Sequence, residues 1–228
     1  MHRLAWWIDG SFIPAVTVLR DFVSIKLFPA FDGLDEEARH VYSNTLNRML
    51  ATAGPDGDFA ALAEAAEDAE ITHYQQMSEA HQGILNLIAV AIYHQFEQQQ
   101  ITLVRRELLF DGSEDAPSRM NTETFVQILK EAGIDPTGFT QWQKLTELRH
   151  VANVAKHAEG YSAGELEKIR PDLFAAPSIR EGTLPPVPRR VYQPLSGVDL
   201  CVTREDLDAY FEAAIGFWKG LSEMVRDA

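Results

Sequence analysis

Three polar residues, Arg149, Asn153 and His157, recur at four-residue intervals within one segment of the chain. In an α-helix, residues four apart lie one above another along a single edge. An imidazole titrates near neutral pH and can move a proton, and a guanidinium holds a phosphate through paired hydrogen bonds. This combination suits cleavage of a phosphodiester, with His157 as general acid or base, Arg149 as the phosphate contact and Asn153 as an orienting group.

A structural role explains the same residues equally directly. A histidine at the C-terminus of a helix is favoured by the helix dipole, and an arginine and an asparagine commonly make interhelical hydrogen bonds. Both interpretations require a helix from about Phe139 to His157. Its core face comprises Leu145, Leu148, Val151, Ala152 and Ala155, and its polar stripe comprises Thr146, Arg149, His150, Asn153 and His157. A bundle places sites between helices at such a border between apolar and polar faces.

The phrase Thr146-Glu-Leu-Arg-His-Val-Ala-Asn-Val-Ala-Lys-His157 resembles the C-terminal helix of HEPN domains. The upstream phrase Ile92-Tyr-His-Gln-Phe-Glu-Gln-Gln99 resembles the long helix that precedes it in such proteins. The resemblance implies a small α-helical bundle, often a homodimer, with RNA as substrate and no metal or other cofactor. It also implies a metal-independent ribonuclease or toxin of a phage-defence or stress system, which could bind a protein partner or an antitoxin.

The family pattern is an arginine, often followed by asparagine, and then a histidine four to six residues beyond the arginine. Asn153 and His157 fit it, but Ala152 stands where the arginine usually lies, and seven residues separate Arg149 from His157. Arg149 could still reach the site, with His150 beside it, or Lys156 could supply the charge. The alternative is a non-catalytic HEPN-like module that interacts with or regulates other components of a defence or toxin–antitoxin system.

His94 and Glu97 are three residues apart and therefore share a helix face. By the resemblance, Glu97 would be the polar partner that faces the Arg/His helix. The other interpretation places both residues at the surface. Five basic residues are close in sequence and could face phosphate or lie scattered in solvent: Lys168, Arg170, Arg180, Arg189 and Arg190.

The spacing Glu-x-x-His occurs three times, at Glu37, Glu70 and Glu147. A di-metal bundle needs two such pairs facing inward and a glutamate from each of two other helices. Because Glu147 is predicted to project away from the core, we expect no metal site. Phosphate-binding glycine loops, zinc-protease motifs and hydrolase nucleophile elbows are also missing from the sequence.

The composition is that of an acidic globular protein: 228 residues, 46% hydrophobic, with a net charge of −14. That charge disfavours non-specific binding to nucleic acid. A single cysteine, Cys201, excludes an internal disulfide. We expect Cys201 to be buried as a small hydrophobic residue. Charged residues and prolines interrupt the apolar stretch from Leu4 to Phe28, so we expect neither a membrane span nor a cleaved leader, and a cytoplasmic protein.

The periodicity predicts an all-α helical bundle and a single domain over residues 1–228. Residues 1–57 form an aromatic-rich segment, part helical and part extended, and then a helix from about Leu34 to Leu50. Residues 58–174 form the HEPN-like core. It begins with a long helical stretch that Asp58 caps and that is broken near Ile71 to His73, followed by a loop at Asp111 to Met120 and a short helix, capped by Asn121, that runs to Ala132. Residues 175–228 form an irregular proline-rich strap, a short strand at Val198 to Val202 and a final amphipathic helix. Capping boxes are expected at Ser162 with Glu165 and at Thr203 with Asp206.

Overall fold

The computed structural model describes residues 2–54, 57–105, 121–175 and 191–227, and within them the regular structure is entirely helical, as predicted. The longer elements are α1 (His2–Trp7), α2 (Ile13–Phe22), α3 (Leu34–Thr52), α4 (Phe59–Leu103), α5 (Thr122–Glu131), α6 (Trp142–His157), α7 (Tyr161–Ile169) and α9 (Arg204–Asp227). The loop expected at Asp111 to Met120 and most of the proline-rich strap (176–190) lie outside the described residues. Among the described helices, none has the length and hydropathy required to span a membrane.

The N-terminal segment is helical from His2 to Phe31, so the prediction that part of it is extended is wrong. Two wide π-helical turns, Ile8–Phe12 and Val23–Leu27, interrupt the α-helical geometry. Its buried residues recur mostly every four positions, a spacing that drifts around a helix of 3.6 residues per turn. The wide turns offset this drift, which keeps one face of the segment against the core.

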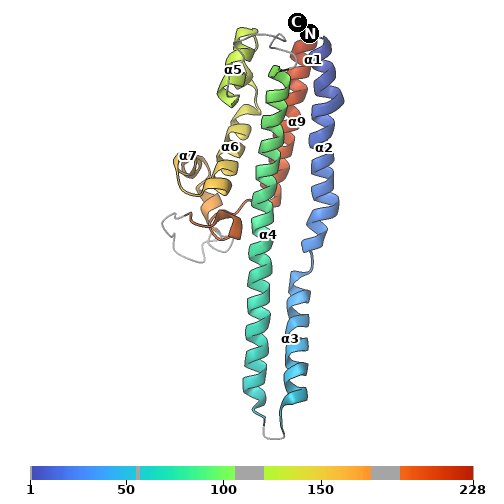
Figure 1. Cartoon of the computed structure of the whole chain (residues 1–228), viewed down its shortest axis with the longest axis vertical. Helices are drawn as coiled ribbons and strands as arrows, with labels where there is room; N and C mark the ends of the chain where they lie inside the picture. Colours follow the sequence, from blue (N-terminus) through green and yellow to red (C-terminus); the bar gives the residue numbers. More distant parts are fainter. Residues whose placement is uncertain (1, 55–56, 106–120, 176–190, 228) are drawn as a thin grey trace.

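Helices α3 and α4 form an antiparallel hairpin that extends well beyond the rest of the molecule (Figure 1). We call its projecting part, α3 with the first half of α4, the arm. Asp58 caps α4 by accepting hydrogen bonds from the amides of Ala60 and Ala61. The predicted break near Ile71 to His73 is wrong, because α4 continues through it, and at 1.5 Å per residue the helix is about 68 Å long. Packing of α3 along its first half supports this unusual length.

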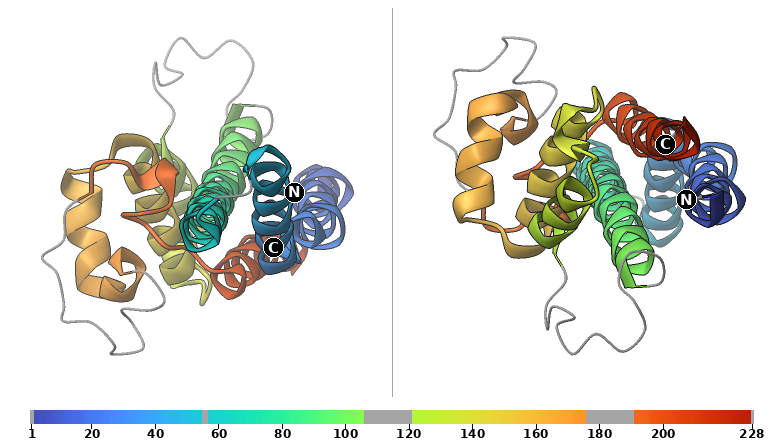
Figure 2. Two further views of the ribbon diagram at one scale, coloured as in Figure 1. Left: turned by 90° about the horizontal axis from the view of Figure 1, so that it is seen from below. Right: turned by 90° about the horizontal axis from the view of Figure 1, so that it is seen from above.

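The body of the molecule surrounds the second half of α4. Viewed along the long axis, α4 and α9 lie between the N-terminal helices on one side and α6 and α7 on the other (Figure 2). Aromatic rings join these elements: Phe96 of α4 lies 5.3 Å from Phe217 of α9, and Phe12 lies 5.0 Å from Trp218, measured between ring centroids. These side chains are almost fully buried, and each contributes roughly 1.5–3 kcal/mol to folding.

The segment before α9 has no strand at Val198 to Val202, contrary to prediction. It is held by a side chain instead: Nδ2 of the buried Asn86 donates to the carbonyls of Pro194 and Leu200, at 2.6 and 2.7 Å. Oδ1 of Asn86 accepts from the amide of Val202 at 3.2 Å. These bonds satisfy backbone groups that a neighbouring strand would otherwise satisfy. Cys201 is buried as predicted.

The N-terminal caps of α5, α7 and α9 can each be compared with the cap that the sequence predicts. Asn121 caps α5, and Thr203 and Asp206 form the predicted reciprocal capping box at the start of α9. The capping box predicted at Ser162 is wrong, because α7 already begins at Tyr161 and no side chain caps it. The Ser162 hydroxyl instead accepts a hydrogen bond from Nδ2 of Asn153 at 3.2 Å.

Candidate functional site

Helix α6 has the predicted core face. Leu145, Leu148, Val151, Ala152 and Ala155 are all buried. Beside this face runs the polar stripe, which the structure directs into two separate hollows: Arg149 lines one of them, and Asn153 and His157 line the other.

Arg149 lies between α6 and α5. Its Nη2 is 3.4 Å from Oε1 of Glu123 in the first turn of α5, and its side chain is 38% exposed. A long, partly solvated pair of this kind is weak. The guanidinium is therefore positioned by α5 but remains available to another anion.

His157 is the last residue of α6 and is exposed. It borders a shallow hollow formed with Asn153 and the turn into α7 (158–163). It lies eight positions after Arg149, which corresponds to about 12 Å along the helix axis. Within one chain, the three predicted catalytic residues therefore do not converge on one point.

The supporting residues also have separate surroundings. Burial lowers the pKa of His150, and Arg149 lowers it further; its Nδ1 is buried with no hydrogen-bond partner among the described residues. Its ring lies 6.3 Å from that of Tyr161. Lys156 is exposed on α6. His94 and Glu97 form a pair on one face of α4, with Nδ1 and Oε2 3.0 Å apart.

The prediction that Glu147 projects away from the core is wrong, because its side chain is buried. Its Oε1 accepts hydrogen bonds from Nη1 of Arg170 at 2.7 Å and from the hydroxyl of Tyr210 at 2.8 Å, and its Oε2 accepts one from Lys144 at 2.8 Å. Arg170 also pairs with Asp206 at 2.8 Å. This buried ionic cluster, defined by Glu147, Arg170, Asp206 and Tyr210, joins α6 to α9.

The remaining sequence candidates give no further site. In the part of the chain that the structure describes, no three His, Cys, Asp or Glu side chains are grouped to hold a metal ion. Of the five basic residues close in sequence, Arg170 belongs to the buried ionic cluster and Lys168 pairs with Glu165 at 2.7 Å. Arg180, Arg189 and Arg190 lie outside the described residues.

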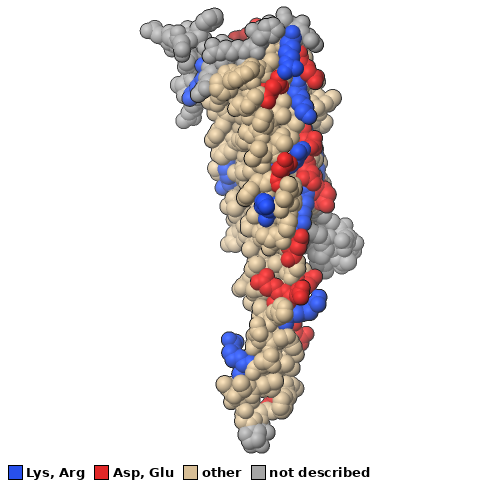
Figure 3. Space-filling model, turned by 90° about the vertical axis from the view of Figure 1, so that its right-hand side faces the viewer, with Lys and Arg blue, Asp and Glu red and all other residues tan. Residues whose placement is uncertain are grey.

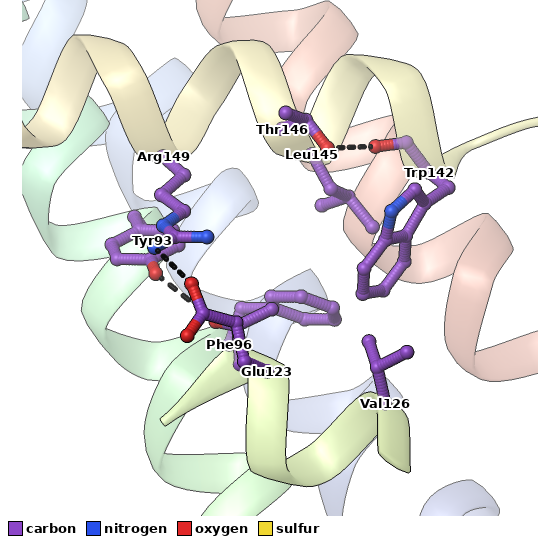
Figure 4. A pocket seen from close by; sticks show the side chains of 9 residues that line it. Tyr93, Phe96, Glu123, Val126, Trp142, Leu145, Thr146 and Arg149 are labelled. Carbon is purple, nitrogen blue, oxygen red and sulfur yellow. Dashed lines mark hydrogen bonds and ion pairs between the residues drawn. The ribbon is translucent and has the colours of Figure 1, made fainter. Parts of the chain in front are cut away.

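The hollow beside Arg149 is a cavity of about 320 Å³ between α4, α5 and α6, which we call the α5–α6 pocket. Its polar residues are Tyr93, Thr122, Glu123, Thr146 and Arg149, and its apolar residues are Phe96, Val126, Trp142 and Leu145. Figure 4 shows Arg149, Glu123 and Tyr93 together at one end and Trp142, Leu145 and Val126 at the other. A pocket with apolar walls and a few convergent polar groups is the usual form of a small-molecule site.

Sequence reasoning did not find this pocket. Helix periodicity predicts that Phe96, Trp142 and Val126 lie on the core-facing sides of their helices. It cannot predict that α4, α5 and α6 leave a gap between these side chains. The signal that was present is Arg149, a cationic residue at the border of an apolar face. Neither a protein-family model, nor a curated protein, nor a solved structure matches this chain.

Proposed function

We propose that this protein is a non-catalytic, HEPN-like interaction module that binds a ligand or partner and does not cleave RNA. The observation that carries the proposal is the division of the polar stripe of α6 between two hollows. Arg149 lines the α5–α6 pocket, and His157 lies about two helical turns away at the surface. Proton transfer needs the acid or base within hydrogen-bond reach of the group that it serves.

The bonding partners of the stripe support the same proposal. The Asn153 amide is hydrogen-bonded to Ser162, and the charge of Arg149 is partly neutralised by Glu123. On the face shown in Figure 3, basic side chains alternate with acidic ones along one edge. With a net charge of −14, the chain repels a polyanion at long range.

An RNA-cleavage assay tests this proposal. The full chain, His157→Ala and Arg149→Ala are each incubated with an end-labelled RNA of mixed sequence, and the products are separated on a denaturing gel. We expect the RNA to stay intact with all three proteins. Cleavage by the wild-type chain that His157→Ala abolishes would contradict the proposal, because contaminating nuclease would be common to all three preparations.

A second candidate function, a ribonuclease acting at a homodimer interface, is favoured by the exposure of His157. An exposed histidine at a helix end is accessible to a second copy, whose Arg149 could then complete the site. Mixing Arg149→Ala with His157→Ala tests this candidate directly. Each mixed dimer would carry one intact Arg/His pair, so activity regained on mixing would favour the ribonuclease over the interaction module.

A further inference from the structure

The α5–α6 pocket has the size and lining of a small-molecule site. Its volume of about 320 Å³ lies at the lower end of the range for ligand pockets, roughly 300–1,000 Å³. Phe96 and Leu145 at its floor are buried, whereas Trp142 is partly exposed. An apolar group that enters the pocket would therefore leave water and contact aromatic carbon.

The polar end of the pocket can orient one anionic group. Arg149 presents a planar set of donors that fits a carboxylate bidentately. The hydroxyls of Tyr93 and Thr122 lie 3.3 Å apart beside it, and each hydroxyl has more hydrogen-bonding capacity than this one contact uses. Thr122 is also the first residue of α5, where the helix dipole favours negative charge.

Glu123 acts as a removable partner for Arg149. Its side chain is 75% exposed and the pair is long, at 3.4 Å, so the carboxylate can turn into solvent at little cost. A ligand carboxylate would replace it at the guanidinium. Because Glu123 stays nearby, the end of the pocket is close to neutral, and this favours a monoanion over a phosphate dianion.

We propose that the α5–α6 pocket binds a small aromatic monocarboxylate. The ring of this ligand would lie between Phe96 and Trp142, and its carboxylate would bind the guanidinium of Arg149. This inference deepens the proposed function, on which it rests, by naming the chemical class of the ligand. It places Arg149 in ligand binding and leaves His157 outside the site. A polyanion such as RNA is disfavoured, since the pocket offers one guanidinium in a strongly acidic chain.

Indole-3-propionate is a suitable probe, and its amide is the matched uncharged control. Binding to the full chain is measured by isothermal titration calorimetry at low salt, with phenyl phosphate as a third ligand. We expect saturable binding of the acid and at least about tenfold weaker binding of the amide, because a charge-assisted hydrogen bond is lost. Binding of phenyl phosphate as tight as that of the acid would overturn the assignment to a monocarboxylate.

Variants locate the binding. Arg149→Gln should weaken binding of the acid about tenfold or more and leave binding of the amide nearly unchanged. Val126→Trp should abolish binding of both by filling the cavity. The control is Arg48→Gln, which removes an exposed arginine of α3 outside the pocket and should change neither affinity. Circular dichroism confirms that each variant is folded.

Besides tight binding of phenyl phosphate, three results would overturn the proposal: no saturable binding of the acid, equal binding of acid and amide, or an Arg149→Gln variant with wild-type affinity for the acid. The measurement on Arg149→Gln tests the proposal even if Val126→Trp fails to fold. None of them depends on the RNA assay, so failure here without RNA cleavage rejects the ligand and keeps the interaction module. RNA cleavage with intact probe binding rejects only the module.

Discussion

Glu147 is a charged residue that the structure places in the core and not at the surface. Its carboxylate is surrounded by donors from three parts of the chain: Lys144 on its own helix, Arg170 after α7, and Tyr210 on α9. Burial raises the pKa of Tyr210, and the negative charge of Glu147 raises it further, so this hydroxyl stays protonated and donates. Removing the carboxylate would leave the buried Tyr210 hydroxyl without its acceptor, whereas Arg170 would keep its pairs with Asp172 and Asp206.

We predict that Glu147→Ala lowers the free energy of unfolding by about 1–3 kcal/mol, because it leaves the buried Tyr210 hydroxyl without its acceptor and removes one of the three carboxylates that pair with Arg170. Urea denaturation followed by circular dichroism measures the change. Glu165→Ala is the control, because the pair of Glu165 with Lys168 is at the surface and should contribute less than about 1 kcal/mol. An equal decrease in the free energy of unfolding in the two variants would mean that the buried ionic cluster stabilises the protein no more than a surface ion pair does.

The misplacement of Glu147 shows what a helical wheel can and cannot predict. The wheel correctly identified the side of α6 that carries Leu148 and Val151, because hydrophobic residues mark a buried face by themselves. It could not identify a second buried side, since that side is covered by Arg170 and Tyr210 and its residues are polar. The same limit hid the α5–α6 pocket, whose shape depends on how three helices pack.

At the scale of elements, α4 holds the segment before α9 by close backbone approach. A Cβ on Gly83 would lie 2.2 Å from the carbonyl oxygen of Leu195. Gly197, in the left-handed region at φ +79°, turns the same segment against α4. Asn86, one turn beyond Gly83, then binds the carbonyls of this segment. A glycine in mid-helix is thus required by its neighbour and not by the helix.

We predict that Gly83→Ala destabilises the protein by about 1–3 kcal/mol despite the higher helix propensity of alanine, because the added methyl group forces the Leu195 segment away. Gly164→Ala in α7 is the matched control. A Cβ there meets nothing within 4 Å, so alanine should stabilise by up to about 1 kcal/mol. Thermal melting of both variants gives the comparison, and stabilisation by Gly83→Ala would show that the segment yields freely.

The elements predicted correctly are those whose signals are local. Asp58, Asn121 and Thr203 were identified as helix caps because a cap depends on residues two or three positions away. The predictions that failed depend on distant partners. Ser162 bonds to Asn153 of the preceding helix, residues 198–202 bond to Asn86, and α4 is continuous because α3 packs beside it.

The whole molecule has two parts with very different cores. The body buries large aromatic side chains, among them Phe96, Phe217 and Trp218. Over most of its length the arm consists of two helices only (Figure 1), and its buried residues include the small side chains of Ala38, Thr45 and Ala66. Less apolar area is therefore removed from water per residue in the arm. Local stability follows buried area, so the arm should open without the body.

We predict that backbone amides in residues 41–52 and 59–72 exchange with deuterium at least about tenfold faster than those in residues 84–103 and 207–221, because the arm opens as a separate unit. Hydrogen-exchange mass spectrometry of the full chain resolves these peptides. Replacing residues 46–66 with a short Gly-Ser linker is the companion test. Because the body core is made by residues outside the replaced segment, the melting temperature of the body should stay within a few degrees of the wild-type value. Equal protection in arm and body, together with unfolding of the shortened chain, would show a single cooperative unit in which the arm stabilises the second half of α4.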